Sequence, residues 1–185
     1  MTYLRTFLPW IVYAAVPSGS WQWGALAALV VAVALIVWQR RAGRTADALI
    51  IETGSAVFFV ALAIVAFADP HSGLHPYTGA LSNGVLALIA AISLAVHRPF
   101  TLGIAKQSTP REYWEMPEFV RINMIITSVW TVSFAVSAIV IAIFAARGDR
   151  TAVIVQVAGL IVPMVFTIRY VAHVKAKVAA MTQAH

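Results

Sequence analysis

The chain has 185 residues, of which 61% are hydrophobic and 11% are charged, with a net charge of +6 and no cysteine. The charged fraction is far below the roughly 25% of a soluble domain, and the lack of cysteine excludes disulfides, thiol catalysis and thiolate metal sites. The basic residues flank apolar runs, so we attribute them to membrane topology and expect no nucleic-acid partner.

Six apolar runs alternate with short polar loops. They cover approximately residues 4–17, 21–38, 46–67, 78–96, 122–146 and 151–171. All but the first hold about 18 to 25 residues, the length that a helix needs to cross about 30 Å of hydrocarbon. We therefore expect an all-α integral membrane protein, a single membrane domain over residues 1–185 that forms a bundle of six transmembrane helices.

The first run is short for a span. Residues 4–17 form only about 20 Å of helix at 1.5 Å per residue. Six spans with a short first helix are the favoured count, and five full spans preceded by a re-entrant half-span, closed by a turn at 17–20, are the alternative.

Lys and Arg residues gather in alternate loops. If the N-terminus is cytoplasmic and 4–17 crosses, only Arg147 and Arg150 of the 13 Lys and Arg residues lie outside. The positive-inside rule then places both termini in the cytoplasm.

The expected outer loop at 69–77 carries Asp69, His71 and His75, which are potential metal ligands. Pro70, Gly73 and Pro76 interrupt any helix that would present the two histidines on one face. We favour an ordinary polar turn, and expect no metal and no cofactor.

The segment 97–121 is the only long connection, and we expect it to lie at the cytoplasmic interface between the fourth and fifth spans. Thr109 and Glu112 have the spacing of a helix-capping box, and Pro117 would limit or kink that helix. Aromatic and charged side chains follow one another here, which is typical of interfacial elements. The candidate partner or lipid interface consists of Arg98, Tyr113, Trp114 and Phe119. The alternative is a linker that only connects two spans.

Polar residues within the spans form a second candidate site. Glu52, Arg169 and Asn123 are expected near the cytoplasmic ends of their helices. A charge in hydrocarbon needs a partner or water, so we expect Glu52 to pair with Arg169. This group is either a proton or substrate site or, as we favour, a structural pair.

The sequence contains no nucleophile elbow, P-loop, Rossmann glycine pattern or His-Glu-x-x-His motif. We therefore expect a protein that is not an enzyme. The sequence is compatible both with a monomer and with a homo-oligomer.

The order of several short motifs resembles the intracellular septation protein A family of small bacterial inner-membrane proteins, or a closely related membrane family. The motifs are Phe7-Leu8-Pro9, Arg98-Pro99, Pro110-Arg111-Glu112-Tyr113-Trp114, Ile122-Asn123, Trp130 with Phe134, and Phe166-Thr167-Ile168. In the family a Trp closely follows this Asn, whereas Asn123 and Trp130 are seven positions apart here.

The resemblance implies a multi-pass protein of the bacterial inner membrane. It implies a role in cell envelope or septum organisation or in lipid homeostasis, with membrane lipids and envelope or division proteins as partners. A small transporter or lipid-handling protein with a polar site near the cytoplasmic helix ends is the alternative.

Overall fold

The computed structural model describes residues 5–43, 49–148 and 152–183, and all regular elements within these ranges are helices. The α-helices are α2 (Leu8–Ala15), α3 (Trp21–Arg41), α4 (Ile50–Ala68), α5 (Thr78–Ala95), α6 (Phe100–Ala105), α7 (Pro117–Ala146) and α8 (Ala152–Gln183). The 3-10 turns η1 (Ser18–Ser20), η3 (His75–Tyr77) and η4 (Arg111–Tyr113) lie in the connections. The expected all-α class is confirmed for this part of the chain.

Five helices in the described ranges are long and apolar enough to cross a membrane. They are α3, α4, the 75–95 region with α5, α7, and the Ile154–Lys177 part of α8. The first helix, α2, has only eight residues, which corresponds to about 12 Å at 1.5 Å per residue. The expected count of six spanning helices is therefore not confirmed.

Two helices continue beyond the apolar runs that predicted them. α7 begins at Pro117 rather than near 122, and α8 continues to Gln183 rather than ending near 171. Proline suits the first position of a helix because its φ is already helical. Residues 164–183 contain no Gly or Pro, so nothing in the sequence stops α8 where its hydrophobicity falls.

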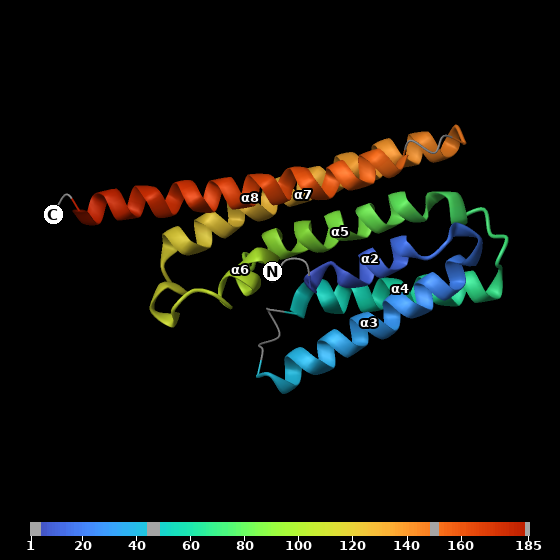
Figure 1. Cartoon of the computed structure of the whole chain (residues 1–185), viewed down its shortest axis with the longest axis horizontal. Coiled ribbons are helices and arrows are strands. Elements are labelled where there is room, and N and C mark those ends of the chain that lie inside the picture. Colours follow the sequence, from blue (N-terminus) through green and yellow to red (C-terminus); the bar gives the residue numbers. More distant parts are fainter. Residues whose placement is uncertain (1–4, 44–48, 149–151, 184–185) are drawn as a thin grey trace.

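Consecutive long helices run antiparallel (Figure 1). α2, α3 and α4 pack together on one side, α7 and α8 form a hairpin on the other, and α5 lies between them and packs most extensively against α7. The C-terminal ends of α3, α5 and α8 lie toward one end of the bundle, together with the N-terminal ends of α4 and α7 and with α6.

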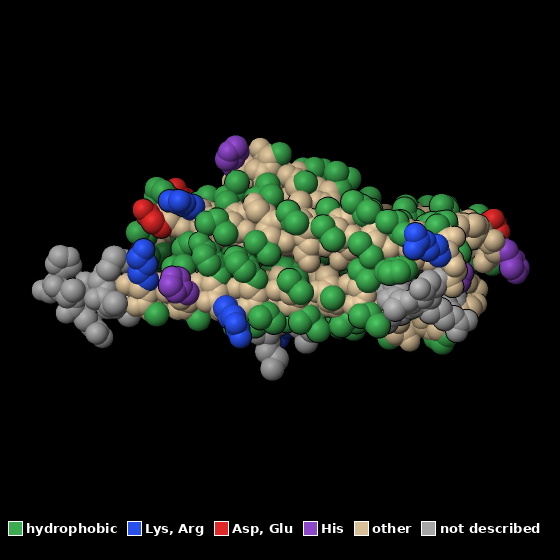
Figure 2. All heavy atoms as spheres, turned by 90° about the horizontal axis from the view of Figure 1, so that it is seen from above, with side chains coloured by type: hydrophobic (Ala, Val, Ile, Leu, Met, Phe, Trp, Pro, Cys, Tyr) green, Lys and Arg blue, Asp and Glu red, His purple; other side chains and the backbone are tan. Residues whose placement is uncertain are grey.

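The two ends of the bundle differ in charge. We call the end that holds α6 the basic end, because ten described Lys and Arg residues lie toward it, whereas Arg147 follows α7 at the opposite end. Between the ends, large apolar side chains such as Val57, Ile64 and Ile139 are more than 60% exposed. In Figure 2 this surface is a belt of apolar side chains between charged ends. Such a belt is what a surface in hydrocarbon requires, and it supports the membrane assignment.

Aromatic side chains hold the short helix α2 in the bundle. Phe7, just before α2, stacks on Trp130 of α7 with ring centroids 5.1 Å apart. The indole of Trp10 packs between Phe58 and Phe59 of α4 and donates a hydrogen bond of 2.8 Å to Ser55 Oγ. α2 is therefore tied to both sides of the bundle although it has only eight residues.

The segment 97–121 differs from the expected interfacial stretch in that part of it is buried. The backbone N–H groups of His97 and Arg98 bond to the carbonyls of Leu94 and Ser93, which is the Schellman ending of a helix, with His97 at φ 55°. The chain then reverses into α6, where Phe100 is 2% exposed. Hydrophobic burial of α6 keeps this portion of the segment against α7.

The helix expected to start at Thr109 is absent from the described structure of that region. Residues Arg111–Tyr113 form a single 3-10 turn without a side-chain cap, and α7 starts only at Pro117. Met116 has an extended conformation, with φ −69° and ψ 130°, because a residue that precedes proline is disfavoured in the helical region. Pro117 therefore begins the next helix instead of limiting an earlier one.

Candidate functional site

Glu52 lies in the first turn of α4 and is 2% exposed. Its Oε1 accepts a hydrogen bond of 3.2 Å from the Thr6 hydroxyl and one of 3.0 Å from Gln39 Nε2. Thr6 precedes α2 and Gln39 is near the end of α3. One carboxyl oxygen thus joins three segments at the basic end of the bundle.

The structure does not bring Glu52 and Arg169 together as an ion pair. Glu52 is enclosed by neutral donors, whereas Arg169 lies on an exposed face of α8. An arginine at the basic end of a span can extend toward the membrane surface, where its charge remains hydrated.

Asn123, the third residue of the expected polar site, is buried in a separate network. Its Nδ2 donates to the Phe119 backbone carbonyl at 2.9 Å, and its backbone carbonyl accepts a bond of 3.0 Å from the Thr101 hydroxyl. Its Oδ1 is buried and has no hydrogen-bond partner among the described residues. The Thr101 and Thr127 hydroxyls are 2.8 Å apart. This network attaches α6 to α7, so Asn123 has a structural environment distinct from that of Glu52.

The expected interface residues differ in the exposure of their side chains and in the contacts that those side chains make. Trp114 donates its indole N–H to the Thr109 carbonyl at 2.9 Å, and its ring lies 5.3 Å from Lys106 Nζ and 5.6 Å from Arg111 Cζ. Tyr113, by contrast, is 45% exposed. Trp114 therefore stabilises its own loop, and Tyr113 offers an aromatic surface.

The other two expected interface residues are Phe119, which follows Tyr113 and Trp114 in the chain, and Arg98, which precedes them. Phe119 is half-buried on the first turns of α7. Arg98 is exposed and, with Lys106, borders a small pocket of about 250 Å³ beside α6. The four expected residues thus share the basic end, and Tyr113 and Arg98 are exposed there.

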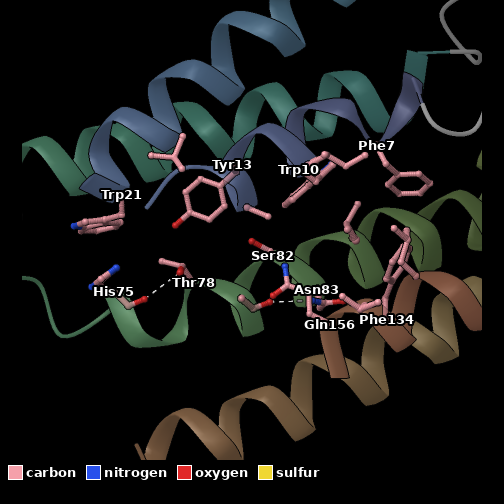
Figure 3. A pocket seen from close by; sticks show the side chains of 17 residues that line it. Phe7, Trp10, Tyr13, Trp21, His75, Thr78, Ser82, Asn83, Phe134 and Gln156 are labelled. Atoms are coloured by element: carbon pink, nitrogen blue, oxygen red, sulfur yellow. Dashed lines mark hydrogen bonds between the residues drawn. The ribbon is translucent and has the colours of Figure 1, made fainter. Parts of the chain in front are cut away.

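A cavity of about 400 Å³ lies between α2, α5, α7 and α8 and contains none of the expected site residues. Figure 3 shows its labelled side chains, with Trp21 and His75 at one end and Phe7 and Phe134 at the other. Its lining consists of Phe7, Trp10, Ile11, Tyr13, Ala14, Val16, Trp21, His75, Thr78, Gly79, Ser82, Asn83, Leu86, Phe134, Gln156, Val157 and Leu160.

The most exposed residues that line the cavity lie on α2 and α8. Among the lining residues, Ile11 on α2 is 38% exposed and Val157 on α8 is 51% exposed. Phe134 on α7 and Leu86 on α5 are at most 5% exposed and form the interior. The exposure of these residues indicates an opening between α2 and α8.

The interior is polar on the α5 and α8 side. Ser82 is 3% exposed, and its Oγ has no hydrogen-bond partner in the described structure. Asn83 Nδ2 donates to the Gly79 carbonyl at 2.9 Å, which leaves Asn83 Oδ1 without a donor among the described residues. Gln156 projects into the same space from α8, with its Oε1 close to Gly79. Three neighbouring side chains thus have unused hydrogen-bonding capacity.

A second polar group lies toward the end of the cavity near η3. Tyr13 and Thr78 both line this part of the cavity, and the Thr78 hydroxyl donates to the His75 carbonyl at 3.0 Å. The His75 ring stacks on Trp21 at 5.1 Å. The Thr78 hydroxyl is thus satisfied within the protein, whereas Ser82 and Asn83, with their free groups, lie deeper along α5.

None of the described lining side chains is Asp, Glu, Lys or Arg. The cavity therefore combines apolar walls with uncharged hydrogen-bonding groups. Pockets of this size and composition typically bind small molecules, with a few polar groups fixing the orientation of the ligand.

The candidate metal ligands of the 69–77 loop have ordinary partners. Asp69 Oδ1 accepts a bond from the His71 backbone N–H, and the His75 ring lies against Trp21. Within the described ranges, no group of three His, Cys, Asp or Glu side chains could hold a metal ion.

The cavity between α2, α5, α7 and α8 was not predicted from the sequence. Asn83 and Gln156 stand out in the sequence as polar residues in apolar runs, which is the signal that could have located it. Such residues more often join helices, and only the packing shows that their amides retain free groups.

Comparison with protein-family models, with curated proteins and with solved structures gave no match.

Proposed function

We propose that this protein is a lipid-handling membrane protein that binds an amphiphilic molecule in the cavity between α2 and α8. The exposure of Ile11 and Val157, which line the cavity and indicate an opening toward the apolar surface, is the observation that carries the proposal. A lipid tail can remain in hydrocarbon outside such an opening while its head reaches the polar interior. The exposed apolar surface that surrounds the opening supports the same reading.

This proposal keeps the lipid-handling alternative that the sequence left open but moves its site. The Glu52 carboxylate accepts two interhelical hydrogen bonds, the Asn123 side chain bonds within α7 and does not line the cavity, and Arg169 is on the exposed face of α8. The free polar groups of Ser82 and Gln156 instead line a space large enough for a ligand. The proposed activity is binding or movement of a lipid, without covalent chemistry.

Native mass spectrometry of the detergent-purified protein tests this function. Ala14 is an exposed residue at the mouth, so Ala14→Phe should narrow the opening without disturbing the core. Ala158→Phe, on an exposed face of α8 outside the cavity, is the matched control. The wild type and the control should retain one bound lipid that Ala14→Phe loses. Equal lipid retention by all three proteins would reject the site.

The membrane placement is also proposed. We infer that the basic end faces the cytoplasm of a bacterial inner membrane, and that the residues up to Ala15 provide a sixth, short crossing. The concentration of Lys and Arg at that end supports this orientation. Reporter fusions at Gly73 and after His185 should report opposite sides, with the C-terminus inside, and reports from the same side would reject it.

A second proposal concerns partners. Tyr113 and Met116 are 45% and 43% exposed at the basic end, and the resemblance to the septation protein A family implies division or envelope proteins as partners. Aromatic and methionine side chains are common anchors of protein interfaces. Tyr113→Ala should weaken recovery of such a partner from mild detergent extracts, and unchanged recovery would leave lipid handling as the sole proposal.

A further inference from the structure

We propose that the cavity selects an uncharged lipid whose head carries a hydroxyl and a carbonyl group, as diacylglycerols do. This inference rests on the proposed lipid-handling function and specifies its ligand. Its basis is the juxtaposition of three neutral polar side chains, Ser82, Asn83 and Gln156, in the interior of a space with an apolar opening between α2 and α8.

The buried hydroxyl of Ser82 is the most specific observation. A hydroxyl that is shielded from water and lacks a partner is unfavourable by about 1–3 kcal/mol relative to a paired one. Ser82 Oγ is in this state in the described structure. The Oγ itself has almost no accessible surface, so a rotation about the Ser82 Cα–Cβ bond into the cavity is needed before it donates to a ligand carbonyl and completes the missing hydrogen bond.

The two amides supply the complementary groups. The hydrogen bond from Asn83 Nδ2 to the Gly79 carbonyl fixes the orientation of the amide. Asn83 Oδ1 can then accept a hydrogen bond from a ligand hydroxyl. Gln156 forms no hydrogen bond with the described residues and can both donate and accept. A head that carries one donor and one carbonyl acceptor matches these side chains.

The absence of Asp, Glu, Lys and Arg among the described lining residues determines the class of head. A phosphate that entered this interior would lose its hydration and find no Lys or Arg among the described lining residues. Burial of an unpaired ion costs far more than burial of a neutral polar group. A phosphorylated lipid with the same tails should therefore be excluded.

The size of the space determines how much of the lipid enters. A volume of about 400 Å³ accommodates a glycerol head and the first part of its chains, not two full acyl chains. The chains must leave between Ile11 and Val157, which are exposed to the apolar surroundings. Contacts with the ligand are thus expected on α2 and α8 as well as on α5.

Photo-crosslinking of the full chain in phosphatidylcholine nanodiscs tests the inference. The probes are a diacylglycerol and a phosphatidate with identical chains, each with a diazirine close to the glycerol. The diacylglycerol probe should label peptides that contain Ile11 and Val157 at least about fivefold more than the phosphatidate probe. Ser82→Ala should reduce this labelling by roughly three- to tenfold, as expected for one lost hydrogen bond.

Two controls separate binding from folding. Removal of an unpaired buried hydroxyl should leave the thermal midpoint of the Ser82→Ala protein unchanged or higher, whereas loss of a structural bond would lower it. Ser128 is an exposed serine on α7 whose hydroxyl bonds to Met124, and Ser128→Ala should not change the labelling.

The outcomes distinguish this inference from the proposed function. Equal or stronger labelling of the mouth by phosphatidate would overturn the uncharged head and leave lipid handling intact. Uniform labelling of all lipid-facing helices by both probes would overturn both. Crosslinks between two copies through the α2–α8 opening would identify a second protomer as its occupant and would also overturn both.

Discussion

Replacement of Glu52 tests whether one carboxyl oxygen holds three segments together. Both hydrogen bonds to the side chain end on Oε1, at 3.2 Å from Thr6 and 3.0 Å from Gln39. Glu52→Gln keeps an oxygen acceptor and the shape of the side chain, whereas Glu52→Leu removes the acceptor and leaves two buried donors unpaired. The two variants therefore separate the hydrogen bonds from the carboxyl group itself.

The expected magnitude follows from the two bonds. Interhelical hydrogen bonds within membranes contribute about 0.6 kcal/mol on average and up to about 1.7 kcal/mol each. Glu52→Leu should therefore lower the free energy of unfolding by about 1–3 kcal/mol, and Glu52→Gln by less than about 1 kcal/mol. Equilibrium unfolding in mixed micelles with increasing sodium dodecyl sulfate measures both changes.

The Arg169→Gln variant provides the control for this reasoning. Because Arg169 is exposed and forms no ion pair with Glu52, its replacement should not change stability alone or in combination with Glu52→Gln. Equal losses in Glu52→Gln and Glu52→Leu, or recovery of the loss by Arg169→Gln, would show that charge rather than the acceptor oxygen holds this site, and would refute the account.

Three further substitutions test the helix ends and contacts. His97→Gly should be neutral or stabilise by up to about 1 kcal/mol, because His97 has φ 55°, whereas His97→Val should destabilise by about 1–2 kcal/mol; thermal unfolding measures both. Gly159→Val should destabilise by about 1–3 kcal/mol in the same assay, since a Cβ at Gly159 would overlap the Ser137 hydroxyl. Trp114→Ala should raise amide hydrogen exchange across 106–114, because the indole bond and two cation–π contacts are lost, and Tyr113→Ala should not; equal exchange in both variants would contradict the assignment of Trp114.

The apolar runs predicted the long helices because a span needs about 20 apolar residues and few loops here are long. They did not predict the ends of α7 and α8, since a helix can continue into water when no Gly or Pro stops it. The short helix α6 was missed because six residues after Pro99 are too few for a periodic pattern.

The candidate site was harder to predict from the sequence than the helices were. Glu52 and Asn123 were identifiable as polar residues in apolar runs, but their partners Thr6, Gln39 and Thr101 depend on packing between distant segments. The cavity arises because α2 is short and α8 leaves a gap beside it. No local pattern encodes such a space.

An experimental structure of the full chain in lipid nanodiscs containing diacylglycerol tests the central claim most directly. We predict an elongated density that begins beside Ser82 and Asn83 and leaves the bundle between Ile11 and Val157. A cavity that is filled by side chains of a second protomer, or that holds only water while lipid density lies elsewhere, would contradict lipid handling at this site.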